Sequence, residues 1–309
     1  MRNAVLTACL VALFPYSAAA QITPECTEPD VLIVFDVSGS MGKAIPGTKY
    51  TLATNAIVAA TKSLDDELRF GLLMFPEPAG QHCDLDPDPQ IPLALNNGGA
   101  FSSLLQPGGG NFWGGPTGSH DTPMFQALDA VTSLPQLQTV ERRHYVVLIT
   151  DGNQDCCIAG DYDNQSDCLP GSTDLDPAEA ADNIADLVAT VKQLAGMGIH
   201  TFVVGLQEKV SASALNQMAV AGLTPKPNCN VNQTDPAAAN NCFYTADDKN
   251  SLEAALGAIA LVIAHFSSDS TRTTFTKALR ARLARRFRSR ALCSPVHRMR
   301  PSGGAHSNH

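Results

Sequence analysis

Residues 31–41 read V-L-I-V-F-D-V-S-G-S-M, an apolar segment followed directly by a short polar one. The run 31–35 is apolar throughout, which is typical of a strand buried on both faces of a parallel sheet. Asp36, Ser38 and Ser40 follow it at intervals of two residues. Because ligands of open α/β sheets bind at the carboxyl ends of the strands, these oxygen donors predict a site for a hard cation such as Mg²⁺, Ca²⁺ or Mn²⁺.

The pattern D-x-S-x-S alone also occurs in ordinary capped turns between a strand and a helix. Preceded by an apolar strand, D-V-S-G-S-M resembles the opening of a von Willebrand factor type A domain, the fold shared with integrin I domains. That family binds a divalent cation at a metal-ion-dependent adhesion site (MIDAS). The site is built from this motif, a threonine in a second loop and an aspartate in a third. The resemblance therefore implies two further loops in this chain.

The second loop ends in T-P-M-F-Q-A-L, residues 122–128. Pro123 suits the first turn of a helix, with Thr122 as its N-cap, and a capping role alone is one interpretation. In the resembling family the metal-binding threonine lies six residues before an apolar helix position, as Thr122 does before Leu128. The resemblance implies Thr122 as the ligand, and Thr117 is the alternative.

The third loop follows a predicted buried strand over residues 144–150, H-Y-V-V-L-I-T. It opens with Asp151-Gly152, which by itself is only a turn signal. Its position as the third motif in order maps Asp151 onto the family's site aspartate.

The other apolar segments alternate between strands and helices, which predicts an α/β fold with a doubly wound, mostly parallel sheet flanked by helices and with disulfide-stapled loops. The domain is expected to span residues 29–265. Further strands are expected at 68–75, 199–206 and 242–245. Helices are expected at 47–64, from 174 or 176 to 195, at 211–221 and at 247–264. Residues 76–123 show no helical period and are expected to form a long loop.

The amino terminus has the pattern of a secretory signal peptide, residues 1–20. A basic start precedes a short apolar segment and a cluster of small residues, which predicts cleavage after Ala20. A membrane anchor is the alternative, but the apolar segment is shorter than the roughly 20 residues that a span requires.

The cysteine content agrees with export. Of nine cysteines, all but Cys9 follow the predicted cleavage point, and an even number in an exported chain predicts disulfides. Cys229 and Cys242 bracket one loop and are the simplest local pair. A zinc site at Cys156, Cys157 and Cys168 is the alternative, without a C-x-x-C pair or a nearby histidine to support it.

Charge divides the chain in two. Residues 267–309 hold ten of the 21 Lys and Arg residues but one of the 30 acidic residues, so the preceding part is strongly acidic. This balance argues against nucleic acid as a partner of the main domain. The basic tail, 266–309, is open to three interpretations: an amphipathic helix that contacts anionic surfaces, a disordered segment, or the product of a shifted reading frame.

Asp84, Asp86 and Asp88 form a second acidic cluster within the long loop. They could bind calcium, but the glycine and glutamate of a calcium-binding hand are missing, and a solvated acidic loop is the alternative.

The resemblance implies an exported adhesion domain that uses a divalent cation to bind an Asp or Glu of a protein or extracellular-matrix ligand. Its implied metal ligands are Asp36, Ser38, Ser40, Thr122 and Asp151. Mg²⁺ is the expected ion, with Mn²⁺ and Ca²⁺ as alternatives. Two other function classes stay open: a module that the metal only stabilises, and a metal-assisted hydrolase. His120 is the only histidine near the motifs, and no Ser-His-Asp order or phosphate-binding loop is visible, so we expect no enzyme.

Overall fold

The computed structural model describes residues 27–42, 44–45, 47–78, 83–110, 115–116, 121–152, 154, 156, 177–206 and 211–267. The predicted signal peptide, nearly all of the basic tail, Thr117, His120, Cys157 and Cys168 lie outside these residues.

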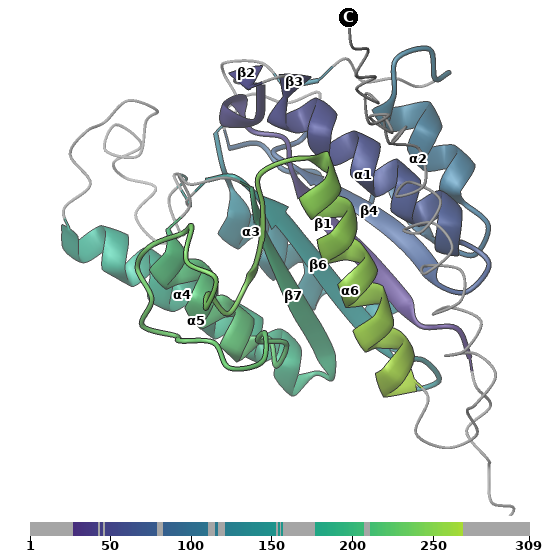
Figure 1. Cartoon of the computed structure of the whole chain (residues 1–309). Coiled ribbons are helices and arrows are strands. Elements are labelled where there is room, and N and C mark those ends of the chain that lie inside the picture. Colours follow the sequence, from purple (N-terminus) through teal and green to yellow (C-terminus); the bar gives the residue numbers. More distant parts are fainter. Residues whose placement is uncertain are drawn as a thin grey trace, which may run out of the picture.

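A six-stranded sheet forms the centre of the molecule, in the order β5-β4-β1-β6-β7-β8 (Figure 1). Five strands are parallel: β1 (Asp30–Asp36), β4 (Arg69–Phe75), β6 (His144–Thr150), β7 (Ile199–Leu206) and β8 (Tyr244–Ala246). The edge strand β5 (Ile91–Ala94) runs antiparallel to β4. The predicted fold class is confirmed.

Helices cover both faces of the sheet (Figure 1). One face packs against α1 (Lys49–Leu64), α2 (Gly98–Leu105) and α6 (Lys249–Ser267). The other packs against α3 (Met124–Thr132), α4 (Pro177–Gly196) and α5 (Ala212–Ala221). Short elements complete the described part: the 3₁₀ turns η1 (Gly39–Gly42) and η2 (Pro135–Leu137), and the two-residue strands β2 (Ala44–Ile45) and β3 (Gly47–Thr48). None of the described helices combines the length and the apolar character that a membrane span needs.

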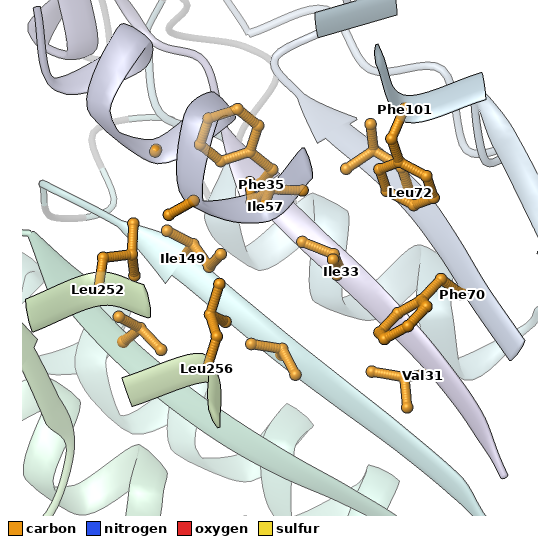
Figure 2. Packing of buried hydrophobic residues seen from close by; sticks show 14 of the residues in the cluster. Val31, Ile33, Phe35, Ile57, Phe70, Leu72, Phe101, Ile149, Leu252 and Leu256 are labelled. Carbon is orange, nitrogen blue, oxygen red and sulfur yellow. The ribbon is translucent and has the colours of Figure 1, made fainter. Parts of the chain in front are cut away.

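The central strand β1 is buried along its whole length, which explains its uninterrupted apolar run. Successive side chains of a strand point to opposite faces, so β1 contributes to two cores. Val31, Ile33 and Phe35 pack beneath α1 and α6 (Figure 2), whereas Leu32 and Val34 pack on the side of α3, α4 and α5.

The long helix-free loop predicted between residues 76 and 123 is wrong in part, because β5 and α2 both lie within it. Helix α2 has eight residues and begins with two glycines, and its buried hydrophobic side chains are Phe101 and Leu105. Two apolar positions four residues apart are too few for a helical period to stand out from the sequence.

The predicted disulfide between Cys229 and Cys242 is confirmed. The second described disulfide joins Cys83 to Cys156, so the zinc alternative is wrong as far as Cys156 is concerned.

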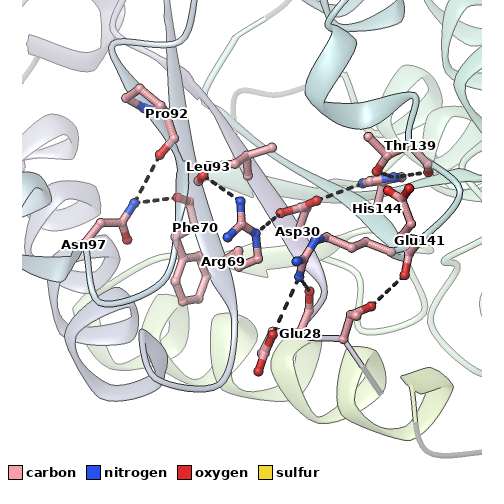
Figure 3. Close-up of polar contacts among 12 residues, drawn as sticks. Glu28, Asp30, Arg69, Phe70, Pro92, Leu93, Asn97, Thr139, Glu141 and His144 are labelled. Carbon is pink, nitrogen blue, oxygen red and sulfur yellow. Dashed lines mark hydrogen bonds and ion pairs between the residues drawn. The ribbon is translucent and has the colours of Figure 1, made fainter. Parts of the chain in front are cut away.

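A polar network ties four strands together at the amino end of the sheet, opposite the predicted cation site (Figure 3). Asp30, the first residue of β1, accepts a hydrogen bond from Arg69 Nε at 2.8 Å and lies 3.2 Å from His144 Nδ1. Arg69 also donates to the carbonyl oxygen of Leu93 in β5 at 3.0 Å, and His144 Nε2 lies 2.7 Å from the carbonyl oxygen of Thr139. Burial by itself lowers the pKa of His144, but the bonds to Asp30 and Thr139 outweigh it and raise this pKa above 6.5.

His144→Gln should remove a stabilisation that depends on pH. Since folding raises the pKa of His144, the stabilisation is fully present below about pH 6.5 and is lost as the pH rises through the folded-state pKa. Urea unfolding should show a larger difference in the free energy of unfolding between wild type and variant at about pH 6 than at about pH 8. Each unit by which folding raises the pKa contributes about 1.4 kcal/mol.

His200→Gln is the matched control with the opposite sign. Burial and the charge of Arg143 lower the pKa of His200, so its contribution should favour the folded state at higher pH. The same pH trend for both variants would contradict the role assigned to the Asp30–His144 pair.

Candidate functional site

The predicted cation-binding motifs meet at the carboxyl ends of β1 and β6. These strands pair in parallel register from Asp30↔His144 to Phe35↔Ile149, so their ends lie side by side. Asp36 is the last residue of β1, and Asp151 directly follows the last residue of β6. The chain after Asp36 makes one further bond to β4, from Val37 N to Phe75 O at 2.7 Å, and then turns through η1.

A continuous chain of hydrogen bonds joins four of the five predicted metal ligands. Asp36 Oδ1 accepts from the backbone N–H of Ser38 at 2.9 Å, and the hydroxyls of Ser38 and Ser40 are 3.0 Å apart. Ser40 Oγ donates to Asp151 Oδ1 at 2.7 Å. Residues 111 positions apart in sequence therefore share one polar cluster.

Thr122, the fifth predicted ligand, faces the same cluster. It is buried, and a Cβ built on Gly152 would lie 3.8 Å from Thr122 Oγ1 and 3.9 Å from Ser40 Oγ, so both hydroxyls lie close to Gly152. The predicted N-cap role is wrong, because Pro123 occupies the N-cap of α3 and the helix begins at Met124. The Thr122 hydroxyl is thus placed toward the other loops by a turn that precedes the helix.

Asp36 is fully buried within the cluster. Burial, and next the negative charge of Asp151, raise the pKa of Asp36 to about 7, although hydrogen bonds from Thr150 and Ser38 oppose the shift. The bond from Thr150 Oγ1 to Asp36 Oδ2 is 2.6 Å long, and Thr150 also accepts from the N–H of Gly152 at 3.2 Å. Without a cation, the protonated form of Asp36 is therefore populated near neutral pH.

Lys49 is the unexpected member of the cluster. Its ammonium group forms a hydrogen-bonded ion pair with Asp151 Oδ2, and both side chains are buried. Lys49 is the first residue of α1, which starts two residues later than predicted because the Thr48 hydroxyl caps it through the N–H of Thr51 at 3.0 Å. No pattern in the sequence singled out Lys49, because its partner lies 102 residues away.

Gln154 connects the third loop to the second, and no sequence pattern pointed to it either. Its side-chain oxygen accepts from the N–H of Phe125 in α3 at 2.7 Å, and its amide nitrogen donates to Gln126 Oε1 at 3.1 Å and to the carbonyl oxygen of Cys156. The disulfide from Cys156 to Cys83 then attaches this loop to the chain between β4 and β5. The segment after Asp151 is thus held at two points.

The donor set suits a hard cation. Two carboxylates and three hydroxyls from Ser38, Ser40 and Thr122 are oxygen donors of the kind that Mg²⁺, Mn²⁺ and Ca²⁺ prefer. In the described part of the chain, no group of three or more His, Cys, Asp or Glu side chains lies together in a metal-binding arrangement. An ion here would therefore depend on hydroxyl oxygens and on water or a partner's oxygens for the rest of its coordination.

In the second acidic cluster, Asp84 and Asp88 are exposed and Asp86 accepts from the N–H of Asp88 at 3.0 Å. This bond forms a local turn within the loop.

Asp36→Asn should change how stability responds to pH in metal-free buffer. Folding raises the pKa of Asp36 from 3.8 to about 7, so the folded state binds the proton more tightly and stability falls as pH rises between these values. Chemical denaturation in buffer that contains EDTA measures this effect. The free energy of unfolding of wild type should fall by a few kcal/mol relative to that of the variant as the pH rises across this range. Asp129→Asn, at an exposed position on α3, should show no such trend. If the stability difference between wild type and Asp36→Asn does not change with pH, the environment assigned to Asp36 is contradicted.

No protein-family model matches the chain, and no curated protein matches it by sequence. Solved structures do match. The open conformation of the pilus adhesin SpaC from Lactobacillus rhamnosus GG is 13% identical with a TM-score of 0.50, over 78% of this chain and 31% of that one.

Two further matches have lower TM-scores. Proximal thread matrix protein 1 (PTMP1) from the mussel byssus, with a zinc-occupied MIDAS motif, is 15% identical with a TM-score of 0.42, over 78% of this chain and 48% of that one. A von Willebrand factor type A structure from Catenulispora acidiphila is 16% identical with a TM-score of 0.40, over 74% and 41%. The chain spans less than half of each of these three proteins, and what the likeness to SpaC shows is the fold.

Proposed function

We propose that this chain is an exported, divalent-cation-dependent ligand-binding domain of the adhesion type. The observation that carries the proposal is the hydrogen-bonded cluster of Asp36, Ser38, Ser40 and Asp151, with the Thr122 hydroxyl beside it. Three loops that are distant in sequence converge there at the carboxyl edge of a parallel sheet, where such folds bind ligands. The resemblance of the three motifs to those of a von Willebrand factor type A domain gives the same expectation.

The proposed ligands contribute to cation binding in two ways. Asp36 and Asp151 supply negative charge, and the three hydroxyls supply neutral oxygens whose protons can turn away from an ion. Thr150 holds Asp36 from behind with a 2.6 Å bond, which orients the carboxylate. Mg²⁺ in such a site keeps exchangeable water, and an Asp or Glu of a protein partner can replace one.

Two features support an extracellular or periplasmic setting. The described part of the chain contains two disulfides, and these persist in oxidising compartments. SpaC, which shares the fold, is itself a pilus adhesin.

The acidic main domain makes a protein or matrix ligand a better partner than nucleic acid. We keep the expectation that the domain is not an enzyme.

Mg²⁺ and Mn²⁺ should bind the wild-type domain and bind Asp36→Asn at least about tenfold more weakly, because the variant removes one of two carboxylates. Isothermal titration calorimetry measures this directly. The amide that replaces the carboxylate can still pair with Ser38 and Thr150, so the fold should survive. Asp129→Asn is the matched control on the surface, and equal affinities for all three proteins would contradict the proposed site.

Ligand binding should need both the cation and a carboxylate. We expect arrayed peptides with an exposed Asp or Glu to bind the domain in Mg²⁺, and to lose binding in EDTA, when Asp36 is replaced, or when the peptide carries Asn or Gln instead. A domain that only uses the metal for stability would show a higher melting temperature in Mg²⁺ with no cation-dependent peptide signal. That result would contradict the proposed ligand-binding function and would leave the metal a structural role only.

A further inference from the structure

Lys49 places a positive charge inside the proposed cation site. The exposed fraction of its side chain is 7%, and that of its partner Asp151 is 0%. Burying an ammonium group is costly unless a partner compensates it, and removing one partner of a buried pair is strongly destabilising. The Lys49–Asp151 pair thus stabilises the cluster in the absence of a cation, and the proposed binding function does not itself require it.

Helix geometry makes the position more unusual. Lys49 is the first residue of α1, where the positive end of the helix dipole disfavours a cation. Its charge is compensated instead by the cluster, where Asp36 and Asp151 already repel each other. The cluster therefore combines two carboxylates with one internal cation.

Both oxygens of Asp151 already accept a hydrogen bond. Oδ1 accepts from the Ser40 hydroxyl at 2.7 Å, and Oδ2 accepts from the Lys49 ammonium. These donors respond differently to a metal ion. A hydroxyl can rotate its proton away and offer a lone pair, whereas an ammonium group has three donors and no acceptor, so it can only repel the ion.

We propose that Lys49 is an internal counter-ion that occupies Asp151 in the cation-free protein and competes with the divalent cation for it. The inference rests on the proposed function and adds a regulatory element to it. A cation gains Asp151 Oδ2 only when the ammonium group leaves, and the flexible four-carbon stem of lysine allows this movement. Lys49 thus raises the cation concentration at which the domain becomes able to bind its ligand.

Lys49→Met should bind Mg²⁺ about tenfold or more tightly than wild type in calorimetry, because the competing charge is gone. In EDTA the same variant should melt at a lower temperature, because Asp151 loses its partner, and Mg²⁺ should reverse the loss. Lys49→Arg keeps the charge and should stay close to wild-type affinity. Lys62→Met, an exposed site on the same helix, should change neither quantity.

The outcomes separate the two proposals. If wild type binds Mg²⁺ and Lys49→Met binds equally or more weakly, the counter-ion role is overturned and the proposed function stands. If neither protein binds Mg²⁺ or Mn²⁺, both fail. Binding by Lys49→Met alone would support the counter-ion role in its strongest form.

A measurement on the unaltered chain covers the case in which Lys49→Met does not fold. Amine-reactive labelling followed by mass spectrometry reports how accessible each lysine is. Adding Mg²⁺ should raise the labelling of Lys49 several-fold, because its ammonium group leaves Asp151, while Lys62 is labelled equally with and without the ion. Unchanged labelling of Lys49 at a Mg²⁺ concentration that saturates the site would overturn the proposal.

Discussion

The parallel pairing of β1 with β6 is the constraint on which the site depends. Two adjacent parallel strands end at the same edge of the sheet, so the residues that follow them are brought together however far apart they are in sequence. Asp36 and Asp151 meet for this reason. The backbone N–H of Ser38 bonds to Asp36, and the hydroxyls of Ser38 and Ser40 continue the link to Asp151. The pairing is held in turn by the complete burial of β1, whose alternate side chains complete a core on each face of the sheet.

Two carboxylates at a buried edge have an electrostatic cost, and the surrounding residues offset part of it. Asp36 is fully buried, and its raised pKa reflects first the loss of water and second the charge of Asp151. Thr150 and Ser38 partly offset this by donating hydrogen bonds. Lys49 compensates Asp151, so the cation-free cluster is not left with two unpaired carboxylates.

The loops that carry the site are also attached to one another. Gln154 bonds to the first turn of α3, close to Thr122. Cys156 forms a disulfide with Cys83, which lies in the chain between β4 and β5. At the opposite end of the sheet, Asp30 joins β1 to its two neighbours through Arg69 and His144. The strands are therefore tied at one end and the loops at the other, which limits how far the proposed ligands can move apart.

Elements that rest on local patterns could be predicted from the amino-acid sequence. The apolar runs predicted β6 and β7 to the residue. The resemblance of three short motifs to a known family implied the set of proposed ligands, and each of these signals is contiguous in the chain. Helix α2 escaped detection because its two buried hydrophobic positions are too few to show a period. The tertiary structure alone decided that Lys49 pairs with Asp151 and that Gln154 links two loops, because these contacts join residues 102 and 29 positions apart and leave no local pattern.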